Sequence, residues 1–303
     1  MTRAPLAPRD LALILAVVAI WGFSFVAIKV GLREIPPFAL AAMRFVFAAV
    51  PLVFFVKPPR IPWQLVVGYG TGIGVFQFGL LFLGMKLGMP AGLSSVVIQL
   101  QVFFTIGLAV AFLGDRFRRD DLLGAMVAAV GVVLLGAHQA SSGKTSTLIG
   151  YGLVIAAALA WGIGNVIAKR AAMRYHADMF ALVVWSSLVP PVPLALLSFL
   201  FEGGPTALEA VLHAGALTWG CVLVLAWGAT LFGFASWAKL LHRYPTALMA
   251  PFGLLIPVSG LAGGAIFLGE GLAPLQWAGV ALVLIGLAEN VFGTRVRARL
   301  RRG

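Results

Sequence analysis

Charged residues are scarce in this sequence. They make up 11% of the 303 residues, whereas an average soluble domain has roughly 25%. Hydrophobic residues make up 61%, and the mean hydropathy is +1.02. So few charges cannot cover a water-facing surface, which excludes an ordinary soluble domain. Because lipid offers no partner for unpaired backbone groups, the composition predicts an all-α integral membrane protein.

Motifs that carry chemistry are also missing. The single cysteine, Cys221, lies in an apolar stretch and has no partner for a disulfide within the chain. We find no Cys/His metal spacing, no nucleophile elbow and no paired acids, and the glycines between residues 68 and 74 lack the ending of a phosphate loop. We therefore expect no enzyme, no metal and no cofactor. A membrane-embedded enzyme and a channel remain the alternatives from other classes.

The basic residues stand at the ends of apolar stretches. Lysine and arginine outnumber aspartate and glutamate by 22 to 10, giving a net charge of +12. Because these residues form no continuous patch, they indicate membrane topology and we expect no nucleic-acid partner. The expected partners are the lipid bilayer and a small-molecule substrate. The oligomeric state stays open, with a monomer sufficient for transport.

Long apolar stretches follow one another along the whole chain. A helix needs roughly 20 apolar residues to cross a hydrocarbon core of about 30 Å. The first stretch is too long for a secretory signal peptide, so we expect it to remain as a spanning helix. We predict ten transmembrane helices, over residues 10–30, 36–56, 63–85, 90–113, 121–138, 148–170, 178–200, 216–240, 245–268 and 274–293.

The loops between these helices differ in charge on the two sides of the membrane. Ten helices place both termini on one side, which carries seventeen lysines and arginines, against four on the other side. Basic loops stay preferentially in the cytoplasm. We therefore predict a multi-pass protein of the bacterial inner membrane with both termini in the cytoplasm.

The chain contains an internal repeat. Trp21-Gly22 recurs as Trp161-Gly162, and Leu113-Gly114-Asp115 recurs as Leu268-Gly269-Glu270. The shifts are 140 and 155 residues. Each copy holds five helices, an odd number, so the second copy enters the membrane from the opposite face, as in many secondary transporters. We predict two inverted five-helix repeats, residues 1–140 and 145–295, followed by a basic cytoplasmic tail, residues 296–303.

These elements, together with Met43-Arg44-Phe45 in the second helix, resemble the EamA-type drug/metabolite transporters over nearly the whole chain. Within that superfamily the chain is most similar to the bacterial aromatic amino-acid exporters of the YddG type. The resemblance implies alternating-access export of amino acids, aromatic and other neutral ones, or of related small metabolites. It also implies a central cavity between helices 1 to 4 and 6 to 9. Multidrug, cationic-metabolite or nucleoside export by the same fold is the alternative, and proton coupling versus facilitated diffusion stays open.

The fourth predicted helix carries the best polar constellation. Ser94, Gln101 and Thr105 share one face at helical spacing, and Ser95 with Gln99 forms an adjoining strip. Uncharged amides and hydroxyls suit a zwitterion, because they bond both of its ends without holding either tightly. The alternative is hydrogen bonding between helices.

Two tryptophans lie deep in helices 1 and 6, each one turn from a polar residue: Trp21 with Ser24, and Trp161 with Asn165. Tryptophans at this depth do not belong to the interfacial belt, so we expect them either to line the substrate path or to pack beside Gly22 and Gly162. Weaker candidates for the cavity lining are Gln77, Phe78 and Trp237.

Two charged residues lie within the apolar stretches, where charge is expensive and points to function. Arg44 either awaits a substrate carboxylate or is a structural arginine bonded to backbone carbonyls or an acid. Glu289 either takes part in coupling or reaches Arg295 and Arg297 at the cytoplasmic end of the last helix.

Overall fold

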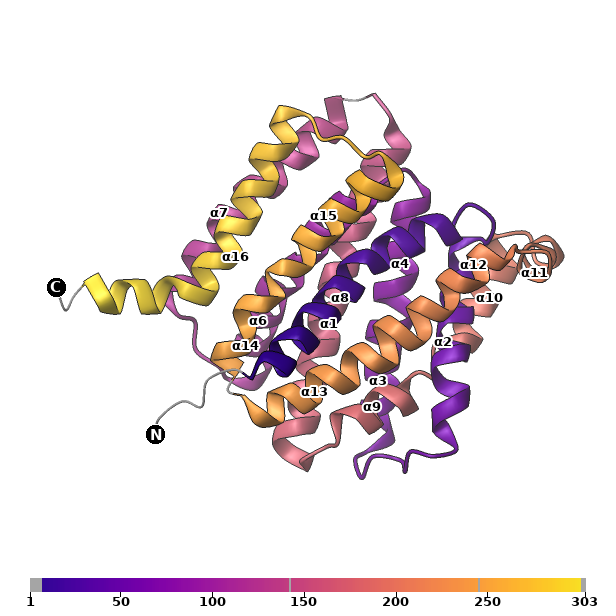
Figure 1. The fold of residues 1–303 in the computed structure, drawn as a ribbon, viewed down its shortest axis with the longest axis horizontal. Coiled ribbons are helices and arrows are strands. Elements are labelled where there is room, and N and C mark those ends of the chain that lie inside the picture. The colour runs from indigo at the N-terminus through magenta and orange to yellow at the C-terminus, as the bar shows by residue number, and fades with distance from the viewer. Residues whose placement is uncertain (1–6, 142, 245, 301–303) are drawn as a thin grey trace.

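The computed structural model describes residues 7–141, 143–244 and 246–300, and within these ranges every regular element is a helix (Figure 1). Large hydrophobic side chains remain exposed on the outside of the bundle, as expected of a surface that faces lipid. The elements are α1 (Pro8–Gly31), α2 (Pro37–Val53), α3 (Trp63–Tyr69), η1 (Gly70–Gln77), α4 (Phe78–Lys86), α5 (Ala91–Val97), η2 (Ile98–Leu100), α6 (Gln101–Leu113), α7 (Arg119–Ser141), α8 (Thr145–Tyr175), α9 (Met179–Ser186), α10 (Pro191–Phe201), α11 (Pro205–Leu212), α12 (Ala216–Leu223), η3 (Val224–Phe232), α13 (Gly233–Arg243), α14 (Thr246–Gly253), α15 (Leu255–Leu268) and α16 (Pro274–Leu300).

Nine helical stretches in the described residues are long and apolar enough to cross a membrane. They correspond to nine of the ten predicted helices. The second predicted helix, expected over 36–56, is shorter, because α2 ends at Val53 after 17 residues. Its proline, Pro51, lies in the last turn, where the missing N–H and the ring weaken continuation of the helix. An extended linker then leads to α3.

Several spans are irregular near their middle. Numbered as the ten predicted helices, the third span (Trp63–Lys86) contains a π-helical segment, η1, and the eighth span (Ala216–Leu241) contains another, η3. Each π-helical segment lies between two α-helical halves of its span. The seventh is interrupted between Ser186 and Pro191, where two consecutive prolines, Pro190 and Pro191, start α10. Pro191 is preorganised for the first turn of a helix but cannot continue one.

The fourth and ninth spans also change geometry near their middle. The fourth passes through the short 3₁₀ segment η2, and the ninth is divided at Leu254, between α14 and α15. Both spans end in the same way, because Gly114 after α6 and Gly269 after α15 adopt left-handed backbone conformations with φ of 73° and 65°. Glycine is favoured at such helix ends because it has no Cβ to clash.

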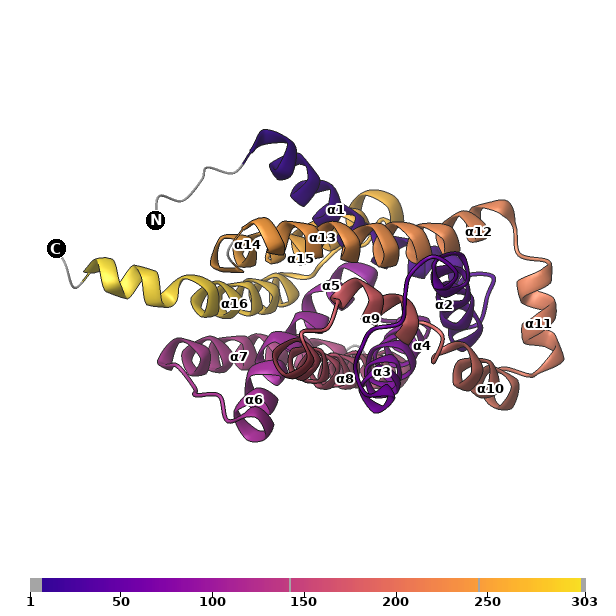
Figure 2. The same cartoon turned by 90° about the horizontal axis from the view of Figure 1, so that it is seen from below.

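The helix pairs that pack most extensively join distant parts of the sequence. α1 packs on α15 and along α12, η3 and α13, while α8 packs on α6, α4, η1 and α3. α2 packs on α10, and α7 packs on α16 at the edge of the bundle. Figure 2 shows α1, α13, α14 and α15 in one layer, with α3, α6 and α8 in the other.

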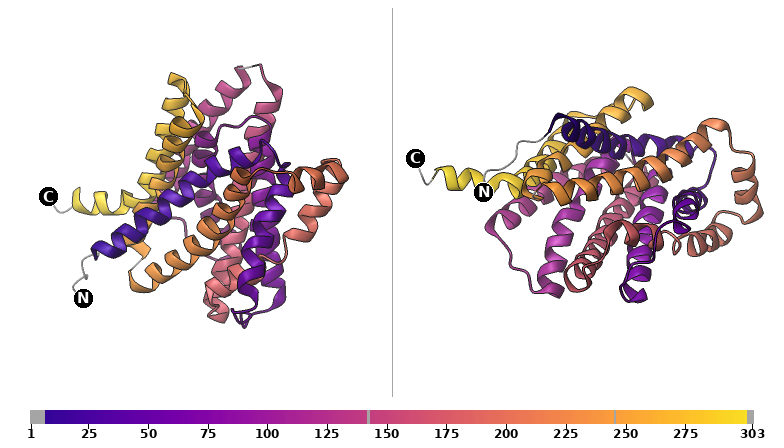
Figure 3. Two further views of the ribbon diagram at one scale, coloured as in Figure 1. Left: turned by 45° about the vertical axis from the view of Figure 1, so that its right-hand side comes forward. Right: turned by 60° about the horizontal axis from the view of Figure 1, so that its bottom comes forward.

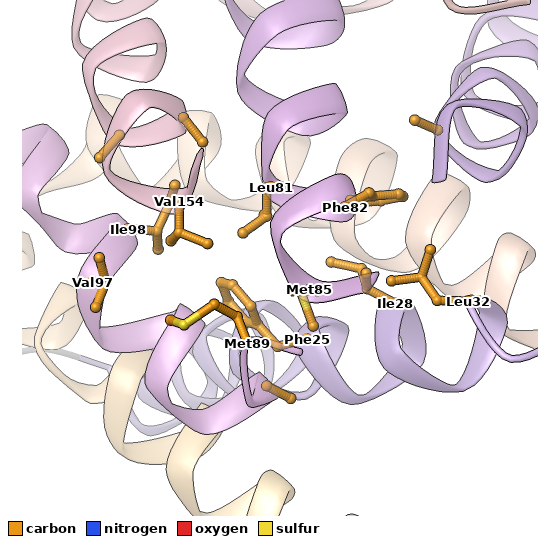
Figure 4. Packing of buried hydrophobic residues seen from close by; sticks show 14 of the residues in the cluster. Phe25, Ile28, Leu32, Leu81, Phe82, Met85, Met89, Val97, Ile98 and Val154 are labelled. Carbon is orange, nitrogen blue, oxygen red and sulfur yellow. The ribbon is translucent and has the colours of Figure 1, made fainter. Parts of the chain in front are cut away.

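The two ends of the bundle differ in how these layers meet. We call one the Lys29 end; it contains the C-terminus of α1 and the N-terminus of α5. The opposite one, the Lys169 end, contains the C-termini of α6 and α8. At the Lys29 end, the last turns of α1 pack against α4 and α5 in a core of fully buried side chains (Figure 4). This core includes Phe25, Ile28, Met85, Met89 and Val97, all between 0% and 6% exposed.

At the Lys169 end the layers are further apart. Ala109 is the one buried residue of α6 in this part of the chain, and the other α6 side chains are half-buried or exposed. α6 and α8 make no extensive contact with α13 or α14 within the described ranges, and the ribbons run in separate layers there (Figure 3). A Cβ placed on Gly107 or on Gly253 would meet no atom within 4 Å. The structure is therefore packed shut at the Lys29 end and loosely packed at the Lys169 end.

Two details differ from the sequence-based expectations. The connection between residues 200 and 216 contains a short helix, α11, which begins at Pro205. Residues 296–300, expected to belong to a tail, continue α16, whereas residues 301–303 lie outside the described part of the chain.

Candidate functional site

Carboxylates join separate helices at the Lys29 end. Glu270, just after α15, accepts hydrogen bonds from the backbone N–H groups of Ala91 (2.7 Å) and Gly92 (2.9 Å), at the first turn of α5. Glu202 accepts from Phe38 (2.7 Å) and Ala39 (3.2 Å) in the first turn of α2. Hydrogen bonds to an ionised carboxylate are stronger than those between neutral groups, and a helix N-terminus favours negative charge. These acids therefore tie helices from the two halves of the chain together.

Lysines complete the closure of this end. Lys29 donates to the backbone carbonyls of Met85 (2.7 Å) and Met89 (2.9 Å), and Lys86 donates to that of Leu32 (2.7 Å). A surface cavity of about 450 Å³ lies among these residues, beside Arg33, Leu268 and Glu270. The lysines therefore satisfy carbonyl groups at the ends of α1 and α4.

At the Lys169 end, carboxylates pair with cationic side chains instead. Asp115, just after α6, forms an ion pair with Lys169 on α8, and both side chains are 38% exposed. Asp10 on α1 pairs with Arg243 at the end of α13 (3.2 Å) and accepts a hydrogen bond from the Tyr244 hydroxyl (2.9 Å). An exposed ion pair such as Asp115–Lys169 contributes about 0–1 kcal/mol, which is less than the helix-capping contacts at the other end. The Asp10 side chain is only 8% exposed, so this estimate does not apply to its pair with Arg243.

A half-buried polar group joins the fourth and sixth spans. Asn165 on α8 donates from its amide nitrogen to Oε1 of Gln101 (2.7 Å) and to Oγ1 of Thr105 (3.1 Å), both on α6. All three side chains are half-buried, in the part of α6 that the second layer does not cover. This group contains two of the predicted site residues, Gln101 and Asn165, together with Thr105, and all three side chains are polar and uncharged.

The remaining polar candidates of the fourth span are packed among helices. Ser95 donates to the carbonyl of Gly92 (2.6 Å), and the amide of Gln99 reaches the carbonyl of Gly253 (3.4 Å). Ser94 is 0% exposed, and its hydroxyl has no hydrogen-bond partner among the described residues, as is true of Oε1 of Gln77. Buried polar atoms of this kind require a partner such as water, or one that another conformation provides.

Aromatic side chains surround the middle of the bundle. The indole of Trp21 donates to the carbonyl of Ala229 in η3 (2.8 Å), and its ring centroid lies 5.6 Å from that of Phe234 and 5.3 Å from that of Trp237. Trp161, Phe78 and Phe234 all pack on one cluster formed by Tyr69, Ile73, Leu182 and neighbouring residues. Ser24, predicted beside Trp21, is buried and donates back to the Trp21 carbonyl (2.6 Å).

The two deep tryptophans differ in their hydrogen bonds. The Trp21 N–H has its acceptor in a π-helical segment, whereas the Trp161 N–H has no acceptor among the residues that the structure describes. Both tryptophans are half-buried, and the glycines after them, Gly22 and Gly162, meet α15 and α6 so closely that a Cβ has no room. The packing interpretation therefore applies to the glycines, while the rings remain partly accessible.

Arg44 is 3% exposed and lies on α2. Its guanidinium stands 3.8 Å from the centroid of the Phe78 ring, and its Nε and Nη2 donate to Thr230 Oγ1 on η3 (3.3 and 3.0 Å). No acid forms an ion pair with it within the described chain. A cavity of about 20 Å³ adjoins the guanidinium.

Glu289 lies away from the middle of the bundle. It is half-buried on α16, which packs on α7 at the edge of the bundle, and it takes part in an interaction with its surroundings. The side chains of its expected partners, Arg295 and Arg297, lie outside the described part of the chain. The structure thus separates Glu289 from Arg44 and from the aromatic group.

Sequence reasoning missed two features. It used Asp115 and Glu270 as repeat markers without assigning them contacts, although an acid right after a helix-ending glycine was a usable signal. It also missed the π-helical segments. The sequence signal for η1 is the glycine-rich run from Gly68 to Gly74, which overlaps its first residues.

The nine apolar spans among the described residues define an integral membrane protein, with polar and aromatic side chains at the middle of its bundle. Residues 9–137 and 148–291 each match the EamA-like transporter family, and the chain belongs to that family. The chain is 42% identical to a probable amino-acid metabolite efflux pump of Salmonella typhimurium, over 97% of this chain and 98% of the relative. It is 40% identical to a protein of the same name from Escherichia coli (strain K12), over 97% of this chain and 99% of the relative.

The family assignment confirms the expected superfamily, and transport rather than catalysis as the kind of activity. A solved crystal structure shares the fold, with a TM-score of 0.64 and 22% sequence identity over 96% of this chain and 98% of that one. The protein is therefore a multi-pass transporter of the bacterial inner membrane that acts on a small molecule.

Proposed function

We propose that this protein exports amino acids, aromatic and other neutral ones, or closely related metabolites, by alternating access across the inner membrane. The observation that carries this proposal is the 40–42% identity, over nearly the full length of both chains, to two proteins named as amino-acid metabolite efflux pumps. The uncharged polar group around Asn165 and the half-buried tryptophans suit a zwitterion with an apolar side chain.

The finer architecture is ten membrane-spanning helices in two inverted repeats, residues 1–140 and 145–295. Helix packing supports this proposal. In the repeat, α1 corresponds to α8 and α15 corresponds to α6, so the α1–α15 pair in one half corresponds to the α8–α6 pair in the other. The pairs α2–α10 and α7–α16 each join two corresponding spans, so they are unchanged when the halves are exchanged. The two π-helical segments begin 154 residues apart, at Gly70 and Val224, close to the 155-residue shift between Gly114 and Gly269. Short α2 then counts as the tenth span.

The orientation follows from charge. Both described ends of the chain lie at the Lys169 end of the bundle (Figure 1). The basic loops on that side favour its location in the cytoplasm. On this assignment the structure is closed toward the outside and loosely packed toward the cytoplasm, which is the state that would take up substrate for export.

Glu270 and Asp115 have equivalent roles: each closes one end of the bundle by capping the N-terminus of a helix from the other half. The two acids are 155 residues apart, and each follows a helix that ends at a left-handed glycine. Glu270 caps the fourth span and holds the outer side shut. Asp115 follows the fourth span as Glu270 follows the ninth, but it is exposed and paired with Lys169. In the opposite state, Asp115 caps the start of α14 while Glu270 releases α5.

Counterflow tests the function. Proteoliposomes loaded with unlabelled phenylalanine should accumulate labelled phenylalanine transiently, and the trans-loading should stimulate uptake several-fold, because a carrier exchanges substrate when its two states interconvert. Gln101→Ala and Asn165→Ala should each reduce exchange, while Thr206→Ala, an exposed hydroxyl on the short helix α11, is the control. Uptake that trans-loading does not change would indicate a channel. Absence of uptake for every neutral amino acid would contradict the proposed substrate class.

A further inference from the structure

The cavity beside Arg44 lies where three spans lose their regular helical structure. Its lining includes Gly70, Ile73 and Gly74 of η1, Thr230 of η3, and Ser186, Ser187 and Pro190 at the interruption of the seventh span. Irregular backbone inside a membrane is tolerated only where protein buries it or where it lines a cavity, and π-helical turns are frequent at functional sites. Discontinuous helices of transporters commonly build the substrate site. Arg44 lies where all three irregular segments meet.

The guanidinium lacks partners in this cavity. It has five N–H donors, and the two hydrogen bonds to Thr230 leave three without a protein acceptor among the described residues. The cation is 97% buried and faces aromatic rings rather than an acid. A buried charge without a counterion is strongly unfavourable, so the arrangement is complete only when an anion is present.

The surroundings add positive potential but few donors. The N-terminus of α10 adjoins the cavity through Pro190, and helix N-termini favour anions. However, residues 190, 191 and 193 are prolines and have no N–H to offer. Arg44 is therefore the charged donor for an anion in this place, and its planar fork matches the two oxygens of a carboxylate, while Tyr69 also lines the cavity.

The cavity also adjoins the aromatic group at the middle of the bundle. Phe234 lines it and lies 5.6 Å from Trp21 between ring centroids, while Tyr69, Ile73 and Val183, which also line it, belong to the cluster on which Trp161 packs. About 20 Å³ admits one or two atoms of water size, which is enough for carboxylate oxygens but not for an amino-acid side chain. The apolar part of a ligand held by Arg44 would extend toward the aromatic rings.

We propose that Arg44 binds the carboxylate of the exported amino acid and thereby selects carboxylate-bearing substrates over amines and amides of the same shape. This inference rests on the proposed export of amino acids and adds the residue that recognises their acid group. The internal repeat does not supply a second copy of this site, because Val184 stands at the position equivalent to Arg44. The recognition is therefore built into one half of the chain only.

A binding comparison tests this role. Purified full-length protein is titrated with L-phenylalanine and with L-phenylalaninamide, which keeps the ring and the amine but has no carboxylate. The wild type should prefer phenylalanine by about 10- to 100-fold, as expected for hydrogen bonds to a charged group. Arg44→Gln should bind phenylalanine and the amide equally. Arg60→Gln, at an exposed arginine in the linker before α3, is the control and should keep the wild-type preference.

Two further variants distinguish carboxylate recognition by Arg44 from a purely structural role of this residue. Arg44→Lys retains the cation but not the paired donors, so it should keep part of the preference for the carboxylate even if Arg44→Gln fails to fold. Thr230→Val removes the competing acceptor and should leave the preference intact. A folded Arg44→Gln or Arg44→Lys with the full wild-type preference would overturn the inference while leaving amino-acid export standing. A wild type that binds only the amide would overturn both.

Discussion

The two ends of this transporter are built from equivalent sequence elements but are held by different interactions. At the Lys29 end, carboxylates cap helix N-termini and glycines allow close backbone contact, as between Gly84 on α4 and Gly150 on α8. At the Lys169 end the residues equivalent to those glycines are Lys239 and Asp10, and the contacts are ion pairs: the exposed Asp115–Lys169 pair, and the buried Asp10 with the exposed Arg243. One end is therefore closed by backbone groups that need a fixed distance, while the other is held by long side chains that tolerate separation.

This contrast shows how a duplicated chain can rest in one state. Perfectly equivalent ends would have equal free energies of closure, and neither state would be preferred. Replacing a glycine pair by charged residues weakens one closure, because exposed ion pairs contribute little while close packing removes apolar surface from water or lipid. The resting state is then the one with the stronger end closed.

Gly84→Val should have a large effect, because it breaks the packed end. A Cβ at residue 84 would stand 2.7 Å from the carbonyl oxygen of Gly150, so α4 and α8 would have to separate. We expect a loss of about 1–3 kcal/mol of stability, typical of overpacking, measured by thermal unfolding in detergent. Gly152→Val on the partner helix α8 has no atom within 4 Å of its Cβ and should be nearly neutral. Equal unfolding temperatures for the two variants would contradict the tight contact.

Glu270→Gln should open the Lys29 end without unfolding the protein. Losing hydrogen bonds to an ionised carboxylate is worth about 1.5–3 kcal/mol, or roughly 10- to 100-fold in the balance between states. The measurement is labelling of Ser94→Cys, in a Cys221→Ser background, by a membrane-impermeant thiol reagent applied from outside. Residue 94 is 0% exposed in the present state, so labelling should rise.

Glu202→Gln is the matched control for that experiment. Glu202 also caps a helix at the Lys29 end, but it joins α10 to α2, a pair that the exchange of halves leaves unchanged. Its loss should lower stability and leave the labelling of residue 94 as it was. Equal labelling in Glu270→Gln and wild type would remove Glu270 from the closing mechanism.

Asp115→Asn should act in the opposite direction and more weakly. If Asp115 caps α14 when the Lys169 end closes, its loss disfavours that state and lowers outside labelling of residue 94. Losing the present exposed ion pair costs the present state at most about 1 kcal/mol and partly offsets the loss of the cap in the opposite state, so the net shift should be smaller than that of Glu270→Gln. Combined with Glu270→Gln, it should return labelling toward the wild-type level. Additive opening in the double variant would show that the two acids are not equivalent.

The smallest expected effect concerns acid pH at the Lys29 end. Glu34 lies in the loop after α1, and its pKa is lowered chiefly by the hydrogen bond from the Gly215 N–H (2.7 Å), with a further contribution from the Thr218 hydroxyl. A lowered pKa in the folded protein means that Glu34 contributes stability above its unfolded pKa and loses it as the pH falls through the folded value. The difference in unfolding temperature between wild type and Glu34→Gln should therefore shrink below about pH 4.5. A difference that does not change between pH 7 and pH 3.5 would exclude this linkage.

The sequence alone predicted the class of fold, because helix length, hydropathy and charge are local properties. Nine of its ten predicted helices match apolar spans of the structure, and prolines and left-handed glycines mark several of their ends. The family was recognisable from motifs that recur in both halves, and the comparisons confirm it. The predicted site residues remain predictions, although the structure brings Gln101 and Asn165 into direct contact.

What the tertiary structure decided is which equivalent groups actually meet. Sequence could not tell that Glu270 reaches the start of α5 while Asp115 pairs with Lys169, since both acids follow the same Leu-Gly dipeptide. Nor could it place Arg44 among two π-helical turns and a broken helix without an acid beside it. Hydrophobic periodicity specifies that a helix forms and crosses the bilayer, but the partner of a polar group depends on how distant helices pack, and that packing differs between the Lys29 end and the Lys169 end.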